Sequence, residues 1–312
     1  MISVLLATHN GADTIERTLA AMSELDSPAG GWKLLVVNNA STDDTEARLL
    51  NWRDRLPMSY IVEPRLGKSK AINVALALAE GDFFVMTDDD VLPDRNWLTE
   101  WRRVADAYPQ CAIFGGAIIP EFGDHPPPSY IPQNWYGLLY GASPRYEEGE
   151  IQPMPGTAFF DIAGANLAMR KSVYDRGGRF DETFLIGRNG LMGEDTEFVR
   201  QQSALGYRVG FTPNARTRHI IRRHQTSWRW IHHRFFRHGR AAFMMMKMLD
   251  MAAGRPVPRF PWHRLLEASG SAMRLLVSLG KSDKEGAFQQ SQALAHDLGA
   301  IRQALATLGR TR

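Results

Sequence analysis

Three consecutive carboxylates, Asp88, Asp89 and Asp90, follow an apolar run in the segment FFVMTDDDV, residues 83–91. Like charges this close repel one another unless a proton or a cation neutralises them. In an extended segment alternate residues face the same side, so Asp88 and Asp90 can converge on one ion while Asp89 points elsewhere. Mg²⁺ and Mn²⁺ prefer carboxylate oxygens and keep positions for substrate phosphates. The triplet predicts half of a divalent metal site, with a helix-capping turn as the structural alternative.

Two further strand-like runs end in short polar side chains, LLATHNGADT at residues 5–14 and LLVVNNASTDDT at residues 34–45. Such residues cap helices and form Asx turns, which is the structural interpretation. They are also suited to grip a base or a ribose, and a glycine allows a nucleotide to approach the backbone closely. Both turns are therefore candidate nucleotide contacts.

Two more positions carry titratable groups. Glu194 and Asp195 stand where a helix begins in GLMGEDTEF, so they either favour the helix dipole or supply a general base for an acceptor hydroxyl. His219 follows the strand-like GFTPNART and is either a hydrogen-bonded loop histidine or a further ligand of the metal bound by the aspartates.

The elements that must position these residues alternate along residues 1–119. Continuous apolar strands separated by helices predict a mostly parallel sheet covered on both faces, with ligands at the carboxyl ends of the strands. Strands are expected at 2–7, 32–37, 58–62, 82–87 and 111–119, and helices at 12–24, 44–55, 68–80 and 94–107.

The rest of the chain is less regular. Residues 120–157, rich in Pro, Gly and Tyr, predict a loop packed over the site. A helix at 194–205 and a strand at 207–211 follow, then a basic helical stretch from about 226 to 250 and C-terminal helices from about 262.

Composition limits the class of protein. The chain has 312 residues, 44% of them apolar, which is enough for a sizeable core, and its single cysteine excludes an intramolecular disulfide.

The net charge is +3, yet Phe198–Leu249 holds ten Arg and one Lys without an Asp or Glu. This stretch suits a solvated face, an anionic membrane surface, a diphosphate or nucleic acid. With no secretory signal and no apolar run of spanning length, we expect a cytoplasmic protein.

Taken in order, SVLLATHNGADTIERTL, LLVVNNASTDDT, GKSKAINVALALAEGDFFVMTDDDV, GANLAMRKSVYDRGGRFDETF and GEDTEFVRQQSALGYRVGFTPNARTRH resemble the inverting glycosyltransferases of family 2, over roughly residues 1–240. The resemblance implies a GT-A fold: an α/β, Rossmann-like, mostly parallel mixed sheet flanked by helices, with C-terminal helices. It places the transferase domain at 1–225, with a nucleotide-sugar half at 1–119 and an acceptor half at 120–225, followed by a helical extension at 226–312.

The resemblance also implies roles for individual residues. Asp195 is the catalytic base, and Mn²⁺ or Mg²⁺ is held by Asp88 and Asp90, with His219 as the further candidate ligand. Donor contacts are expected at Thr8, Asn10, Asn38, Asn39, Asp43, Lys70, Asp88 and Asp89, and acceptor contacts at Gly164, Ala165, Asn166 and Glu194.

The function implied is transfer of one sugar from a nucleotide-sugar donor, UDP-sugar favoured, to a hydroxyl of a glycan or lipid-linked acceptor. Many family members carry Asp where this chain has Asn38, and QTSWRW at 225–230 only approximates the family pattern QxxRW, so processive polymer synthesis is not supported.

A sugar-phosphate nucleotidyltransferase and a non-catalytic nucleotide-sugar or glycan binding module are the alternatives. Nucleic acid is not an expected partner. The other expected partners are the inner face of a membrane, contacted through the basic stretch, and a second subunit.

Overall fold

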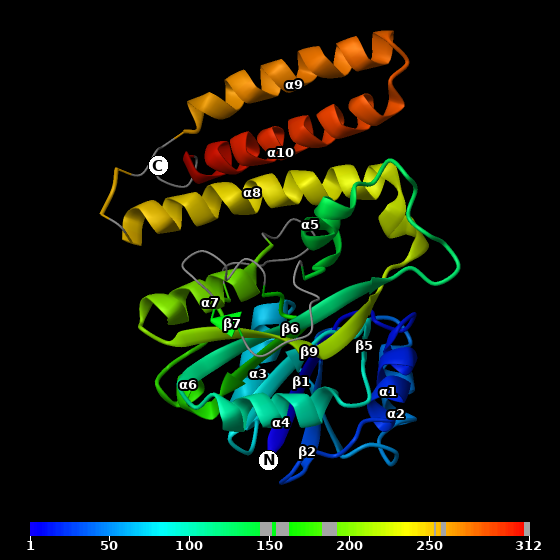
Figure 1. Ribbon diagram of the computed structural model, residues 1–312, viewed down its shortest axis with the longest axis vertical. Coiled ribbons are helices and arrows are strands. Elements are labelled where there is room, and N and C mark those ends of the chain that lie inside the picture. Colours follow the sequence, from blue (N-terminus) through cyan, green and yellow to red (C-terminus); the bar gives the residue numbers. More distant parts are fainter. Residues whose placement is uncertain (144–151, 154–161, 183–191, 253, 257–259, 309–312) are drawn as a thin grey trace. The chain divides into compact units, whose positions relative to one another are not determined.

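The computed structural model describes residues 1–143, 152–153, 162–182, 192–252, 254–256 and 260–308 (Figure 1). The chain divides into two compact units. The first comprises Met1–Gly123, Asn134–Gly187 and Glu194–Ile221. The second, helical unit consists chiefly of Arg222–Arg312 together with Asp124–Gln133. It therefore begins close to the expected start of the helical extension, but it also takes in part of the segment expected to be a loop.

The first unit is built on one mixed sheet, in which the described residues form nine strands ordered β3-β2-β1-β4-β8-β6-β9-β5, with β7 paired to β9. Strands β3, β2, β1 and β4 are parallel, β8 is antiparallel to both β4 and β6, and β6 is parallel to β9. The strands are β1 (Ile2–Thr8), β2 (Trp32–Asn38), β3 (Met58–Val62), β4 (Phe83–Thr87), β5 (Val91–Pro93), β6 (Cys111–Glu121), β7 (Gln152–Pro153), β8 (Asn166–Arg170) and β9 (Arg208–Ile220).

Helices cover both faces of this sheet. On one face lie α1 (Ile15–Ser23), α2 (Thr45–Leu50) and α4 (Trp97–Ala107), and on the other lie α3 (Lys68–Leu78), α6 (Lys171–Asp175) and α7 (Glu194–Ala204). Side chains alternate between the two cores along each strand: Val4 and Leu6 pack on the first face and Leu5 on the second. This period explains why the apolar runs of the sequence are continuous.

The expected elements of residues 1–119 are present, and the predicted GT-A-type α/β architecture is confirmed. The structure adds β5, β8 and α6, which are too short to stand out from their neighbours in the sequence, and β9 extends well beyond the expected 207–211. Within 120–157, the described residues form a 3₁₀ turn (Gln133–Trp135), α5 (Tyr136–Tyr140) and β7. The rest of that expected loop, 144–151 and 154–157, lies outside the described residues.

The helical unit consists of α8 (Trp228–Ala252), α9 (Trp262–Gly280) and α10 (Lys284–Leu308), preceded by a 3₁₀ turn (Arg223–Thr226). Helix α10 lies between α8 and α9 (Figure 1). Phe288 of α10 packs against Tyr130 and Trp228, with ring centroids 4.6 and 4.8 Å away. Among the described residues, none of the helices combines the length and the apolar character required to cross a membrane.

Candidate functional site

The candidate site begins at the edge of the sheet where β1, β2 and β4 end. Thr8 pairs with Asn38 across β1 and β2, and Leu6 pairs with Thr87 across β1 and β4. Because these strands are parallel, their carboxyl ends share one edge. The polar turn after β1, the Asn pair of β2 and the carboxylate triplet are therefore neighbours in the fold, although Thr8 and Asp89 are 81 residues apart in the sequence.

The three carboxylates of the triplet have three different partners. Asp88 Oδ1 lies 2.5 Å from Lys68 Nζ. Asp89 Oδ2 accepts a hydrogen bond from the Thr8 hydroxyl, and the Asp89 carbonyl accepts another from Thr18, at 2.9 Å. Asp90 Oδ1 lies 3.4 Å from His219 Nε2. Repulsion within the triplet is thus offset by separate contacts.

The Asp89 contact also requires glycine at position 11. A Cβ atom added at Gly11 would overlap both the Asp89 carboxylate and the Thr8 hydroxyl. Gly11 therefore lets the turn after β1 close over Asp89, which ties that turn to the end of β4.

His219 reaches Asp90 because β9 pairs with β5 directly after the triplet, with His219 opposite Val91. Its Nδ1 lies 2.6 Å from the Tyr140 carbonyl, and a carbonyl can only accept, so Nδ1 carries the proton and donates it. Burial lowers the pKa of His219, but the Asp90 carboxylate and the Tyr140 carbonyl outweigh it and raise the pKa. A histidine fixed through Nδ1 in this way presents Nε2 as the remaining ligand atom.

Lys68 stands at the first position of α3 and was not among the residues singled out from the sequence. Its Nζ lies 3.8 Å from Glu194 Oε1 in addition to its contact with Asp88. Burial would lower the pKa of Lys68, but the carboxylates of Asp88, Glu194 and Asp195 raise it instead. The ammonium therefore stays charged and connects the triplet to the acidic pair at the start of α7.

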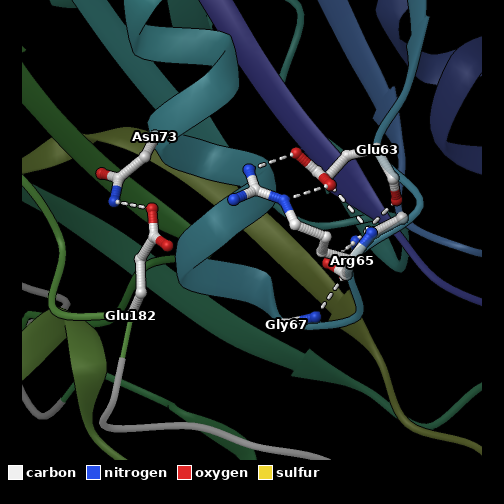
Figure 2. A network of polar contacts seen from close by, with 6 residues as sticks. Glu63, Arg65, Gly67, Asn73 and Glu182 are labelled. Atoms are coloured by element: carbon white, nitrogen blue, oxygen red, sulfur yellow. Dashed lines mark hydrogen bonds and ion pairs between the residues drawn. The ribbon is translucent and has the colours of Figure 1, made fainter.

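A network of hydrogen bonds fixes the start of α3 (Figure 2). The buried Asn39 side chain donates to the Glu63 and Arg65 carbonyls, at 3.0 and 2.9 Å, and accepts from the Gly67 amide at 2.7 Å. Gly67 has a φ of 145°, a conformation that favours glycine. Asn39 thereby holds the turn that places Lys68.

The same turn is stabilised by a two-point ion pair. The Arg65 guanidinium donates to both oxygens of the buried Glu63 carboxylate, at 3.0 and 2.8 Å, and this hydrogen bonding lowers the pKa of Glu63. Further along α3, Asn73 donates to the Phe180 carbonyl at 2.8 Å and to Glu182 at 3.1 Å (Figure 2). Helix α3 is thus anchored to segments from both halves of the first unit.

Asp195 and Glu194 begin α7, next to the segment that precedes β8. Asp195 Oδ2 accepts from the Gly164 amide at 2.6 Å, and Oδ1 accepts from the Thr196 amide at 2.8 Å. Burial, together with the neighbouring Asp195 charge, raises the pKa of Glu194 to about 7, although Lys68 opposes the shift. A carboxyl group that titrates near neutrality beside a fixed carboxylate is suited to proton transfer.

The remaining sequence-predicted residues take structural contacts. Asn166 is fully buried: it donates to the Ala117 and Ala215 carbonyls at 2.9 and 2.8 Å and accepts from the Trp97 indole at 2.9 Å. Its side chain therefore braces the sheet, while acceptor contacts at Gly164, Ala165 and Glu194, and at Asn166 itself, stay predictions. The positive charge of Lys70 helps to lower the pKa of Glu63, and its expected contact with the donor diphosphate stays a prediction.

The turns after β1 and β2 are joined to each other. Asn10 Oδ1 accepts from the Thr42 amide at 2.8 Å, and Asp43 accepts from the Ala12 and Thr45 amides at 3.2 and 3.1 Å. Burial raises the pKa of Asp43, but a hydrogen bond from the Thr45 hydroxyl, together with these amide bonds, outweighs it and lowers the pKa. Asn38 donates to the Tyr60 hydroxyl at 3.0 Å. These contacts shape the edge where a donor base is expected, and direct donor contact stays a prediction.

Comparison with known proteins bears on the family. The model of Glycosyl transferase family 2 matches residues 3–178, more than half of the chain. The chain belongs to this family. It is similar to the probable glycosyltransferase YdaM of Bacillus subtilis, with 26% identity over 231 residues, covering 69% of this chain and 50% of YdaM. The TarS poly(ribitol-phosphate) beta-N-acetylglucosaminyltransferase of Staphylococcus aureus is 32% identical over 108 residues, covering 34% and 19%. The chain thus spans half or less of the length of these relatives.

Solved structures show the same fold. The mannosyltransferase PcManGT from Pyrobaculum calidifontis, in complex with GDP-Man and Mn²⁺, has a TM-score of 0.59 and 19% identity, covering 100% of this chain and 75% of that one. S. aureus TarS 1–349 in complex with UDP-GlcNAc has a TM-score of 0.54 and 15% identity, covering 97% and 91%. At these identities the likeness carries the fold and not the ligands.

Proposed function

We propose that this family 2 chain transfers one sugar from a nucleotide-sugar donor to a hydroxyl acceptor with inversion. The observation that carries the proposal is the continuous line of contacts from Asp88 through Lys68 to Glu194, with Asp195 next to it. These contacts bring Asp88, expected near the donor phosphates, into one site with Glu194 and Asp195, expected to move the acceptor proton. Among the relatives, TarS acts on poly(ribitol-phosphate), which supports a glycan acceptor in polysaccharide or glycolipid assembly.

The side chains at the triplet fit a divalent cation. Asp88 and Asp90 supply hard oxygen ligands, and His219 supplies Nε2, whose partner nitrogen is already bound to a carbonyl. No group of three His, Cys, Asp or Glu residues in the described parts of the chain is preformed as a metal cage. An Mg²⁺ or Mn²⁺ ion that keeps open positions for donor phosphates needs no such cage. When bound, the ion supplies positive charge to the leaving diphosphate.

The chain's own residues carry the proton and position the acceptor. Asp195, held by the amides of Gly164 and Thr196, takes the proton from the acceptor hydroxyl as that oxygen attacks the anomeric carbon. The carbon–oxygen bond to the diphosphate breaks on the opposite side of the sugar, so the configuration inverts. Gly164 and Ala165, beside Asp195, contact the acceptor. Lys68 keeps positive charge next to the departing phosphates.

We favour a UDP-sugar as the donor. TarS, a relative 32% identical over 108 residues, has been solved in complex with UDP and with UDP-GlcNAc, whereas PcManGT was solved with GDP-Man. The nucleoside contacts that we propose are Thr8, Asn38 and the turn that contains Asn10 and Asp43, with Asn39 shaping the same edge through its bonds to the backbone.

The test is release of nucleoside diphosphate from UDP-, GDP- and dTDP-sugars, with and without Mn²⁺ or Mg²⁺. Asp90→Asn and Asp195→Asn are each expected to lower the rate by about 10²-fold, because each removes a charged group from the reacting atoms. Asp54→Asn is the matched control. Asp54 precedes β3 and so lies at the opposite edge of the sheet from the site.

Other products would give other answers. Pyrophosphate release from a nucleoside triphosphate and a sugar phosphate would replace the proposal with a nucleotidyltransferase. Donor binding without turnover under every metal condition would indicate a binding module.

A further inference from the structure

Helix α9 of the helical unit exposes a row of large apolar side chains. Trp262 is 71% exposed, Leu266 78%, Met273 63% and Leu276 64%. Their spacings of four, seven and three residues place them on one face of the helix, which Leu265 and Val277 widen. Single exposed apolar residues are normal on protein surfaces, whereas a contiguous exposed apolar patch of this kind indicates an interaction site.

The opposite face of α9 is the one that packs. Ala268 and Ser271 are its buried residues, and Arg264 reaches Asp297 of α10 at 3.0 Å. The helix is therefore held to α10 by small and polar residues, while its large apolar residues point away from that contact.

The charge around this face is positive. Arg222–Arg312 contains 16 Lys and Arg against 5 Asp and Glu, a net charge of +11, whereas the whole chain carries +3. On α9 itself and just beyond it, the exposed His263, Arg274 and Lys281 recur at helical spacing beside the apolar row. An apolar face with a basic border and a tryptophan at one end is the pattern of a helix that lies in a membrane interface.

We propose that α9 docks on an anionic lipid surface, with Trp262, Leu266, Met273 and Leu276 in the headgroup boundary. A second copy of the chain fits less well, because a two-fold contact through this face would bring two segments of +11 together. Lipid phosphates supply the complementary charge. The inference concerns the helical unit and does not depend on sugar transfer.

The basic stretch expected from the sequence to touch a membrane is mostly α8, which exposes Trp228 and Met251 near its two ends but buries apolar residues along its length. Ile231 is fully buried, and Phe243 packs against Ala300 and Ala304 of α10. The positive charge of α8 adds to the net positive charge of the helical unit. The apolar side chains proposed to enter the lipid surface are those of α9.

The experiment is flotation of the full chain with vesicles of phosphatidylcholine alone or mixed with phosphatidylglycerol. We expect binding to the mixed vesicles, weaker binding to phosphatidylcholine, and loss of binding at high salt, which screens the charges. Leu266→Gln combined with Leu276→Gln should reduce binding by about tenfold or more, because two apolar side chains no longer enter the interface. Leu205→Gln, at a leucine 75% exposed in the first unit, is the matched control.

Both leucines are exposed, so the double variant is expected to fold, and its thermal unfolding should match that of the wild type. Equal binding by the double variant and the wild type would overturn the proposal. So would a wild-type chain that ignores both vesicles, and in that case a dimer in sedimentation that the same two substitutions dissociate would identify a second copy as the occupant.

Discussion

Lys68 Nζ lies 2.5 Å from Asp88 Oδ1, and this ion pair ties the start of α3 to the carboxylate triplet. Lys68 begins α3, and its ammonium also lies 3.8 Å from Oε1 of Glu194 at the start of α7. One cation thus lies between the carboxylates expected at the donor and those expected at the acceptor. Its positive charge is therefore attracted to both groups of carboxylates.

The first prediction separates Lys68 from Lys70, two residues further along the same helix. Lys68→Met should lower kcat/KM by about 10²-fold, because the leaving phosphates lose a fixed positive charge. Lys70→Met should change it by about twofold or less, since the charge of Lys70 acts on Glu63, whereas Lys68 contacts Asp88 directly. Steady-state kinetics of both variants with the preferred donor decide between them. An equal loss from both would restore the role that the sequence suggested for Lys70.

The second prediction concerns the pH dependence of stability at Glu194. Its pKa is about 7 in the folded chain and near 4.5 in the unfolded chain. The unfolded state loses its proton first, so the stability present below pH ~4.5 is lost as pH rises through ~7, on the order of 3 kcal/mol. Glu194→Gln should remove this loss, making the variant more stable than the wild type near pH ~8 but not near pH ~4.5.

Urea denaturation at both pH values measures the difference, with Glu24→Gln at an exposed position as the control. The same Glu194→Gln variant should be impaired in transfer, because a titratable group next to Asp195 is lost. A variant that gains no stability at the higher pH would show that Glu194 ionises normally in the folded chain.

The sequence predicts the strands and helices of residues 1–119 well, because apolar periodicity is a local signal. The prediction that Asp88 and Asp90 face one side and Asp89 the other assumed an extended strand, whereas β4 ends at Thr87 and Asp89 and Asp90 lie in the turn that follows. Lys68 was missed because its position depends on Gly67 and on Asn39, which is 28 residues away in the sequence. No pattern within GKSK distinguishes the two lysines.

The asparagines show a second limit of sequence interpretation. Asn39 and Asn166 stand beside motif residues and have the chemistry of ligand contacts. In the fold, both are buried and use their amides to satisfy backbone groups. Whether a polar side chain faces the site or the core depends on which carbonyls lie opposite it, and these come from distant strands.

The third prediction tests the turn that places Lys68. Asn39→Ala would leave two carbonyls and the Gly67 amide without their partner in a buried position, which should cost about 3 kcal/mol of stability. Asn51→Ala, at an exposed helix end, should change stability by about 0.5 kcal/mol or less. Denaturant unfolding measures both. At temperatures where Asn39→Ala is still folded, its kcat should fall toward that of Lys68→Met; unchanged kcat would mean that Lys68 is positioned without Asn39.

The fourth prediction concerns the close contact between α8 and α10 in the helical unit. A Cβ at Gly239 would overlap the backbone carbonyl of His296, and a Cβ at Gly299 would overlap that of Phe236. Because backbone atoms cannot rotate away, Gly239→Ala or Gly299→Ala must force the helices apart, and each should cost about 3 kcal/mol.

Gly270→Ala in α9 is the matched control, since its new methyl group meets only the flexible end of Arg274. Here the reduced backbone freedom of the unfolded chain dominates, so this variant should be more stable by about 0.5–1 kcal/mol. Thermal unfolding followed by far-UV circular dichroism compares the three. If Gly239→Ala destabilises the chain while Gly270→Ala stabilises it, backbone contact and not helix propensity determines the change in stability. If all three substitutions stabilise the chain, α8 and α10 do not approach as closely as described.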